Sequence, residues 1–243
     1  MKVFVTGATA GFGEAIAKRF INEGHSVVAA GRRKDRLDAL AKETGCDIEV
    51  LDVKDKDAVF DVFSRHTDID VLVNNAGLAL GLEPAQETDI EDWDRMVDTN
   101  IKGVIYCARA VLPNMVERNK GHIISIGSAA GNWPYPGVNV YGSTKAFVQQ
   151  FARNIRNDLF GTKVRSTNIE PGMADTEFST IRFKGDKSKA DKVYAGTQAL
   201  TAEDLAETVY WVATLPEHVN VNTMELMSVN QSWSPFHINR DVE

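Results

Sequence analysis

The sequence has few cysteines, few basic residues relative to acidic ones, and no long apolar run. Cys46 and Cys107 are its only cysteines, which allow neither a disulfide framework nor a cysteine-based metal site and fit a reducing compartment. No apolar run approaches the roughly 18 residues that a membrane-spanning helix needs. Residues 1–7 enter a strand pattern at once, so we expect no signal peptide. These absences favour a cytoplasmic protein.

Charge narrows the range of partners. Lysine and arginine total 27 against 34 acidic residues, a formal net charge of -7. A chain this acidic has no general attraction for phosphate backbones or anionic lipid, so we expect neither nucleic acid nor a membrane as partner. The five histidines are scattered without metal-ligand spacing, and we expect no metal site. A small-molecule ligand remains the expected partner.

Short β-branched runs alternate with longer helical patterns along the 243 residues. The expected strands are residues 3–6, 26–30, 48–52, 71–74, 122–126, 164–169 and 224–229. The expected helices are residues 13–23, 34–44, 56–65, 90–118, 140–160 and 202–215. Most strand runs are apolar at successive positions, as in strands buried on both faces of a parallel sheet. This pattern predicts an α/β fold with a doubly wound parallel sheet of seven strands, in a single domain over residues 1–243.

Local signals refine these elements. Patterns that resemble capping boxes begin at Thr88 and at Thr201, and Pro113 is expected to end or kink the fourth helix. One polar stretch, residues 174–196, lacks clear periodicity and is long for a plain connection. We therefore expect it to form a mobile lid over a substrate.

A glycine-rich turn joins the first expected strand to an amphipathic helix. Its glycines allow a tight turn and a close approach to a pyrophosphate, and the helix N-terminus offers free N–H groups to phosphate. The G-x-x-x-G-x-G spacing departs from the G-x-G-x-x-G fingerprint, so a glycine-rich turn without a ligand is the alternative. The position at the first strand–helix turn favours a dinucleotide. The expected contacts here are Gly7, Thr9, Ala10, Gly11, Phe12 and Gly13.

The end of the second expected strand indicates which dinucleotide is bound. An NAD site usually has an acidic residue there, whereas this strand ends in Gly31, Arg32 and Arg33. The two arginines can bind a 2′-phosphate in bidentate fashion, which predicts a preference for NADP(H) over NAD(H). The alternative is that both are solvated residues opening a charged helix. Further cofactor contacts are expected from Asp52, Val53, Asn75, Ala76 and Gly77.

Tyr141 and Lys145 stand at i and i+4 of an expected helix and so share one face. A phenol with a pKa of about 10 is a poor base at neutral pH, but a nearby ammonium favours phenolate and lowers that pKa. Removing an alcohol proton during hydride transfer requires such a base. The pair alone is a weak signal, because Tyr and Lys often stand four apart on a solvated helix face.

Two further polar residues join this pair. Ser128 follows the fifth expected strand, where its hydroxyl can donate to a substrate carbonyl, although a turn hydrogen bond is the plainer alternative. Asn100 lies within a helix, where asparagine is mildly unfavourable, so we expect its side chain to fix a water that links Lys145 to solvent. Pro171 and Gly172 are expected to turn the chain beside the nicotinamide.

Together and in this order, these residues resemble the short-chain dehydrogenase/reductase family. The T-G-x-x-x-G-x-G, N-N-A-G, Asn, Ser, Y-x-x-x-K and P-G elements span most of the chain. The resemblance implies a Rossmann-type sheet, NADP as cofactor, and homotetramers formed through the helices that carry Asn100 and Tyr141. The catalytic residues that it implies are Asn100, Ser128, Tyr141 and Lys145. Its implied cofactor contacts also include Tyr141, Lys145, Pro171, Gly172 and Thr176.

Further segments, among them residues 75–81 and 182–186, are similar to bacterial members that oxidise short 3-hydroxy acids with NADP. That similarity implies serine, L-allo-threonine and 3-hydroxypropionate as substrates, bound by Ser128, Tyr141 and Arg182. A buried substrate carboxylate must be paired, and Arg182 is the expected partner, with Lys184 second and a solvated loop charge as the alternative. Two other functions stay open: a broad-specificity NADPH carbonyl reductase and a non-catalytic NADP sensor.

Overall fold

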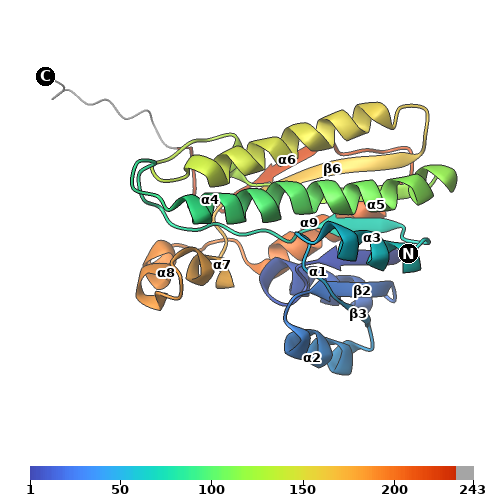
Figure 1. Ribbon diagram of the computed structural model, residues 1–243, viewed down its shortest axis with the longest axis horizontal. Helices are drawn as coiled ribbons and strands as arrows, with labels where there is room; N and C mark the ends of the chain where they lie inside the picture. The colour runs from blue at the N-terminus through green and yellow to red at the C-terminus, as the bar shows by residue number, and fades with distance from the viewer. Residues whose placement is uncertain (234–243) are drawn as a thin grey trace, which may run out of the picture.

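The computed structural model describes residues 1–233, and its centre is a parallel sheet with helices on both faces (Figure 1). The strand order is β3-β2-β1-β4-β5-β6-β7. The strands are β1 (Lys2–Thr6), β2 (Ser26–Gly31), β3 (Asp47–Val50), β4 (Val71–Asn74), β5 (Gly121–Ile126), β6 (Val164–Pro171) and β7 (Thr223–Leu226). The expected doubly wound α/β sheet is confirmed. Residues 234–243 of the expected domain lie outside the described residues.

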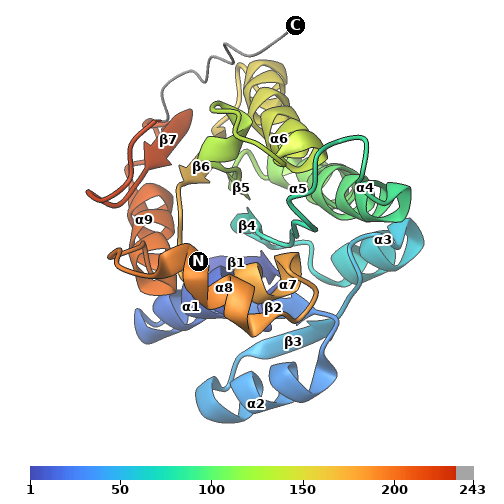
Figure 2. The same cartoon turned by 90° about the vertical axis from the view of Figure 1, so that its left-hand side faces the viewer.

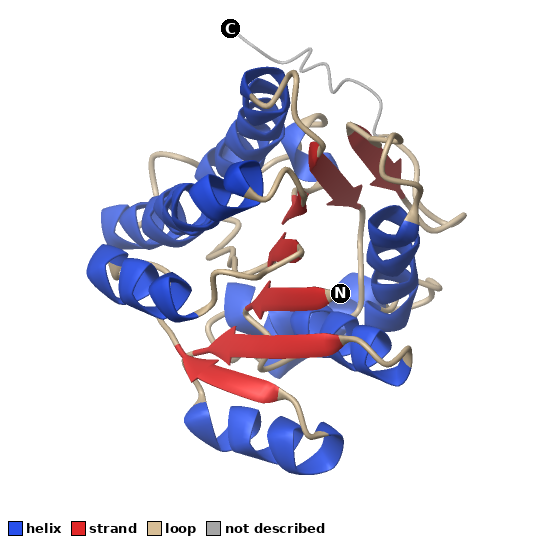
Figure 3. Ribbon diagram, turned by 90° about the vertical axis from the view of Figure 1, so that its right-hand side faces the viewer, coloured by secondary structure: helices blue, strands red, loops and turns tan. Residues whose placement is uncertain are grey.

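The central strands β1, β2 and β4 are apolar at successive positions because they feed two cores. In β1, Val3 and Val5 belong to one cluster of buried side chains, whereas Phe4 belongs to the other. Successive side chains of a strand point to opposite faces, so a strand covered on both sides must be apolar throughout. The neighbouring strands twist relative to one another across the sheet (Figure 3).

The helices divide between the two faces of the sheet (Figure 2). Side chains of α1, α2 and α9 fill one core, and those of α3, α5 and α6 fill the other. Their bounds are α1 (Gly11–Asn22), α2 (Lys34–Thr44), α3 (Lys56–Arg65), α4 (Ile90–Val97), α5 (Gly103–Glu117), α6 (Asn139–Asp158), α7 (Glu177–Arg182), α8 (Lys187–Tyr194) and α9 (Ala202–Thr214). A π-helical turn, Asp98–Lys102, joins α4 to α5, and a short 3₁₀ helix covers Ala129–Gly131.

Pro113 does not end the fourth helix, because α5 continues past it to Glu117, and the alternative that it kinks the helix stays a prediction. A proline inside a helix removes one hydrogen bond. Here Val111 and Met115 on the same helix are buried against the sheet, and we attribute the continuation of the helix to this packing. Elsewhere the expected long elements match the observed ones to within about three residues at each end.

One of the two expected caps is confirmed. The hydroxyl of Thr201 accepts from the backbone N–H of Asp204, whose carboxylate accepts from the N–H of Thr201, so α9 begins with a capping box. The other prediction is wrong by one residue, since Asp89 rather than Thr88 caps α4 by accepting from the N–H of Glu91. A carboxylate at this position also interacts favourably with the helix dipole.

Residues 174–196, expected to be irregular, contain the two short helices α7 and α8. Thr176 caps α7 and Asp186 caps α8, each through a side-chain oxygen that accepts a backbone N–H. Helices of six and eight residues are too short to show a clear 3.6-residue periodicity, which explains why the pattern did not reveal them. The two helices cross the carboxyl ends of the strands (Figure 2), the edge at which such sheets bind ligands.

Candidate active site

A groove with a volume of about 630 Å³ follows the carboxyl edge of the sheet. The glycine-rich turn, the strand ends and the 174–196 segment line it. It crosses the boundary between β1 and β4, where the strand order reverses direction and doubly wound folds bind dinucleotides. All the expected cofactor contacts except Gly13 line this groove, as do all the expected catalytic residues except Asn100. The structure thus brings together residues that are scattered over most of the sequence.

Gly13 has a packing role instead. A side chain at this position would collide with the carbonyl oxygen of Gly7, so α1 can approach β1 closely only with glycine here. Gly7 itself has a left-handed φ of 68°, a conformation that side chains disfavour. Ala10 precedes α1 and supplies no side-chain cap, so the N–H groups of the first turn are available to an anion.

The arginines after β2 are held by other residues to different degrees. Arg33 donates from Nε and Nη2 to the hydroxyl of Thr9, at 3.0 and 2.8 Å, and from Nη1 to Glu177 at 3.1 Å. Arg36 lies one turn along α2 and donates to the same carboxylate at 2.8 Å. Arg32 lines the groove and forms no ion pair within residues 1–233. Arg36 was not among the predicted site residues, although its i+3 spacing from Arg33 was a usable signal.

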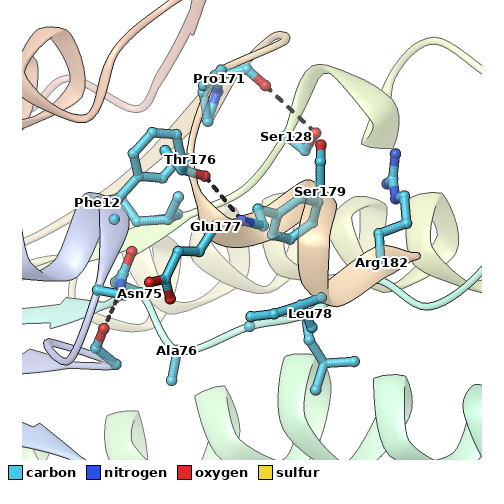
Figure 4. Close-up of a pocket in the computed structure, with 18 of the residues that line it drawn as sticks. Phe12, Asn75, Ala76, Leu78, Ser128, Pro171, Thr176, Glu177, Ser179 and Arg182 are labelled. Atoms are coloured by element: carbon cyan, nitrogen blue, oxygen red, sulfur yellow. Dashed lines mark hydrogen bonds between the residues drawn. The ribbon is translucent and has the colours of Figure 1, made fainter. Parts of the chain in front are cut away.

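Asn75 fixes the floor of the groove (Figure 4). Its Nδ2 donates to the carbonyl oxygens of Thr6 and Gly7, at 2.9 and 3.3 Å, and so ties the end of β4 to the end of β1. The hydroxyl of Thr6 accepts the backbone N–H groups of Asn75 and Ala76, both at 3.0 Å. The expected turn at residues 75–77 is therefore held in place at the strand ends.

Tyr141 and Lys145 lie on adjacent turns of α6, and both side chains are buried. Nζ of Lys145 lies 5.8 Å from the centroid of the Tyr141 ring and donates to the carbonyl of Ile126 at 2.7 Å. Burial lowers the pKa of Lys145 to about 8. Burial also raises the pKa of Tyr141 to about 12.

Two neighbours oppose this rise in the pKa of Tyr141. The charge of Arg182 and a hydrogen bond with Ser128 both lower it. Lys145 donates to the carbonyl of Ile126, and its expected lowering of the pKa of Tyr141 stays a prediction. A cation from the 174–196 segment and a hydroxyl after β5 thus lower the pKa of the Tyr141 phenol.

Ser128 forms the turn hydrogen bond considered for it, and its donation to a substrate carbonyl stays a prediction. Its hydroxyl accepts the N–H of Ala130 at 3.1 Å, which is the expected turn hydrogen bond, and lies 3.5 Å from the carbonyl oxygen of Pro171 (Figure 4). The same hydroxyl lines the groove beside Tyr141. Capping the short 3₁₀ helix fixes the side chain without removing it from the site.

Asn100 lies behind the groove rather than in it. In the π-helical turn, its Oδ1 accepts the N–H of Leu78 at 2.9 Å, and its Nδ2 donates to the carbonyl of Leu78 and to the hydroxyl of Thr144. The side chain therefore joins the segment after β4 to α6. Its link to a water beside Lys145 stays a prediction.

Arg182, on α7, reaches the part of the groove that Ser128 and Tyr141 line, which we call its chemical end. Its guanidinium carbon lies 5.1 Å from the centroid of the Tyr141 ring and 5.3 Å from that of Phe178, and Nη2 donates to the hydroxyl of Tyr135 at 3.4 Å. Within the described chain Arg182 forms no ion pair, and its buried Nε lacks a hydrogen-bond partner. A cation with unmet donors is suited to an anionic ligand.

Lys184, the second candidate for a substrate carboxylate, is not part of the groove lining. Its Nζ lies 2.6 Å from the buried carboxylate of Asp92 on α4. A buried carboxylate needs a partner, so this pair anchors the 174–196 segment to the rest of the molecule. The suggestion that Lys184 binds substrate is therefore wrong.

Several lining residues had no signal in the sequence. Tyr194 on α8 donates its hydroxyl to the carbonyl of Ala174 at 2.8 Å and lies 2.5 Å from the hydroxyl of Ser179, which braces α7 against α8. The other lining residues that were not anticipated include Leu78, Tyr135, Phe178 and Gln231. No local spacing places them, because they come together only when the 174–196 segment folds over the strand ends.

Within residues 1–233, no group of three His, Cys, Asp or Glu side chains is arranged to hold a metal ion. No helix in that range has both the length and the apolar character needed to cross a membrane.

Comparison with known proteins gives consistent matches. The profile of the short chain dehydrogenase family matches residues 1–187. NADP-dependent 3-hydroxy acid dehydrogenase YdfG of Salmonella typhi is 60% identical over 247 residues, covering 99% of this chain and 100% of that protein. Sulfoacetaldehyde reductase 2 of Chromohalobacter salexigens is 50% identical, covering 98% of each chain. The closed form of serine dehydrogenase complexed with NADP⁺ superimposes with a TM-score of 0.98 at 57% identity, covering 99% of this chain and 100% of the other.

Proposed function

The chain belongs to the short chain dehydrogenase family, and on this premise we propose that it is an NADP-dependent 3-hydroxy acid dehydrogenase. It transfers a hydride between NADP(H) and short 3-hydroxy acids or the corresponding 3-oxo acids, with serine, L-allo-threonine and 3-hydroxypropionate as expected substrates. The observation that carries this proposal is the guanidinium of Arg182, which has no ion pair within residues 1–233 and lies over the ring of Tyr141. A carboxylate bound there would bring the C3 hydroxyl of the same substrate to the phenol.

The residues along the groove fit a phosphorylated dinucleotide. The uncapped start of α1 and the close approach at Gly13 suit a pyrophosphate, as in other dinucleotide folds. Arg32 and two remaining N–H groups of Arg33 would hold the 2′-phosphate, since three of the five guanidinium N–H groups of Arg33 already have partners. Asn75 and its neighbours would lie beneath the nicotinamide ribose.

At the chemical end, each residue has a separate task. Ser128 donates to the substrate oxygen and holds it beside Tyr141, which takes the alcohol proton during oxidation and returns it during reduction. Arg182 pairs with the substrate carboxylate. Lys145 would hold the nicotinamide ribose through its ammonium, and Asn100 would position a water for proton exchange with solvent. Bound NADP supplies the hydride chemistry.

The substrates named for the relatives support an anion-binding task for Arg182. A 3-hydroxy acid carries a carboxylate, and sulfoacetaldehyde carries a sulfonate. Both groups accept hydrogen bonds from a guanidinium in bidentate fashion. A carbonyl reductase for uncharged substrates, the alternative function, needs no cation there to bind its substrate.

We further propose that the enzyme works in the cytoplasm as a homotetramer. Phe147 and Phe151 support an interface on α6, because their rings stack 5.5 Å apart on the helix that carries Tyr141 and both are partly exposed. Partly exposed aromatic pairs are common at subunit contacts. Light scattering coupled to gel filtration measures the assembly size.

A substrate panel tests the proposed reaction. We expect NADP⁺ to be reduced with L-serine, L-allo-threonine and 3-hydroxypropionate, with a higher kcat/KM than NAD⁺ supports. Uncharged alcohols and diketones are the comparison set. Equal or better turnover of the uncharged set contradicts the proposal and favours the broad carbonyl reductase.

Tyr141→Phe separates an enzyme from a sensor. It keeps the buried ring and removes only the hydroxyl, so kcat should fall by about 10²- to 10⁴-fold while NADPH still binds. A wild-type protein that binds NADPH without any turnover would instead be the non-catalytic sensor.

A further inference from the structure

The carboxylate of Glu177, in the 174–196 segment, bridges the two sides of the groove at the end where Arg33 lies. Glu177 is the first residue of α7, and its Oε2 lies 3.1 Å from Nη1 of Arg33. Both of its oxygens also lie within 2.9 Å of Nη1 of Arg36. The two arginines lie at the start of α2. Arg33 is 144 residues before Glu177 in the sequence. These contacts join α7 to α2 across the groove.

The surroundings of Glu177 fit an arrangement in which the start of α7 is closed over the groove. In Figure 4 its carboxylate points away from Arg182 and toward the side of the groove where Phe12 and Asn75 lie. The neighbouring Thr176 packs on the glycine-rich turn, where a Cβ at Gly11 would lie 3.4 Å from the Thr176 Cβ. The start of α7 thus covers the region expected to hold the pyrophosphate.

The ionic contacts favour the charged form of Glu177. Burial would raise the pKa of this carboxyl, but hydrogen bonds from Arg36 and Arg33 outweigh that effect and lower it. The carboxylate is therefore ionised at neutral pH. Arg33 in turn is held from two sides, by Thr9 and by Glu177, so its guanidinium plane is fixed in advance.

We propose that Glu177 is a positioning residue that latches the 174–196 segment over bound NADP(H) by pairing with Arg33 and Arg36. This inference rests on the proposed use of NADP. The latch leaves Arg32 and two N–H groups of Arg33 for the 2′-phosphate, so closing it does not compete with recognition of the phosphate. Cofactor release then requires both ion pairs to separate, and Glu177 sets the release rate of NADPH.

The test measures release directly, without turnover. NADPH is bound to the full-length protein, displaced with excess NADP⁺, and followed by its fluorescence in a stopped-flow instrument. Glu177→Gln keeps the shape and removes the charge, and it should release NADPH about three- to tenfold faster, as expected for partly exposed ion pairs. Arg36→Gln removes a partner of Glu177 and should also speed release. Arg36 is not among the groove-lining residues, so this change removes no expected cofactor contact.

A double variant and a matched control sharpen the result. If Glu177 and Arg36 act through one contact, the double variant should release NADPH no faster than Glu177→Gln alone. Asp191→Asn removes an exposed carboxylate from α8 in the same segment and should leave the release rate unchanged. Trypsin cleavage at Lys187, Lys189 or Lys192 of the NADPH complex should be faster in the two latch variants and unchanged in the control.

The outcomes are distinct. Unchanged release from Glu177→Gln overturns the latch. Slower release also overturns it, because Glu177 would then be an internal anion that competes with the 2′-phosphate. A wild-type protein that fails to bind NADPH overturns the proposed function, and the latch with it.

Discussion

The guanidinium of Arg182 lies over the ring of Tyr141, with its carbon 5.1 Å from the ring centroid. The two residues come from different parts of the fold, since Tyr141 is on α6 beside the sheet and Arg182 ends α7 in the 174–196 segment. The cation can therefore act in two ways, as the partner of a substrate carboxylate and as a charge that lowers the pKa of the phenol. Each action leads to a separate prediction.

The first prediction concerns substrate binding. Arg182→Gln removes the cation that we assign to the carboxylate, and KM for L-serine or 3-hydroxypropionate should rise about 10- to 100-fold, since a charged hydrogen bond contributes about 1.5 to 3 kcal/mol. Steady-state kinetics should show little change in KM for an uncharged alcohol. Lys187→Gln, an exposed cation of the same segment, is the control and should change neither value. Equal changes for charged and uncharged substrates would argue against carboxylate recognition.

The second prediction concerns pH. Oxidation requires the phenolate of Tyr141, whose fraction increases as pH rises through its pKa. Because the charge of Arg182 lowers that pKa, Arg182→Gln should raise it and shift the rising limb of the rate profile to higher pH. The profile is measured with an uncharged alcohol, so that loss of carboxylate binding does not interfere. Arg182→Lys keeps the charge, so its profile should lie close to that of the wild type; identical profiles for all three proteins contradict this role.

The third prediction concerns stability. The pKa of Lys145 is about 8 in the folded protein, below its ordinary value of 10.5, so burial of the ammonium destabilises the fold. This penalty is fully present below pH 8, fades as pH rises toward 10.5, and amounts to about 3 kcal/mol at neutral pH. The free energy of unfolding of Lys145→Met minus that of the wild type should therefore be largest near pH 7. It should decrease as the pH rises toward 10.5.

Denaturant unfolding of both proteins at several pH values measures this difference. Loss of the hydrogen bond to the Ile126 carbonyl destabilises the variant by an amount that does not depend on pH in the same way. Lys192→Met, at an exposed position on α8, is the control and should show a flat difference. A flat difference for Lys145→Met as well would mean that burial does not perturb this lysine.

The fourth prediction concerns cofactor choice. Arg32 lines the groove and has no ion pair within residues 1–233, so Arg32→Gln removes a phosphate contact without disturbing another pair. Fluorescence titration should show about 10- to 100-fold weaker binding of NADPH and little change for NADH. Lys34→Gln, two residues further along the chain, is the control. It removes the same charge at a position outside the groove lining and should change neither affinity. Equal weakening for both nucleotides would place Arg32 away from the 2′-phosphate.

Much of the fold and part of the site follow from local patterns. Successive apolar residues in β1 and β4 predict strands covered on both faces, because alternate side chains must enter opposite cores. The glycine-rich turn and Tyr141 with Lys145 are likewise short-range signals, since their spacing alone places the glycines at a turn and the two side chains on one helix face. Strand order then gathers these segments at one edge of the sheet.

The residues themselves thus determined the strands, the glycine turn and the shared face of Tyr141 and Lys145, because each depends on neighbours a few positions apart. Tertiary structure alone decided that Glu177 meets Arg33, that Arg182 covers Tyr141, and that Lys184 is paired elsewhere. Those partners are separated by tens to more than a hundred residues, and no local period encodes such distances. Their contacts depend on how α7 and α8 pack over the strand ends, which is set by the whole folded chain.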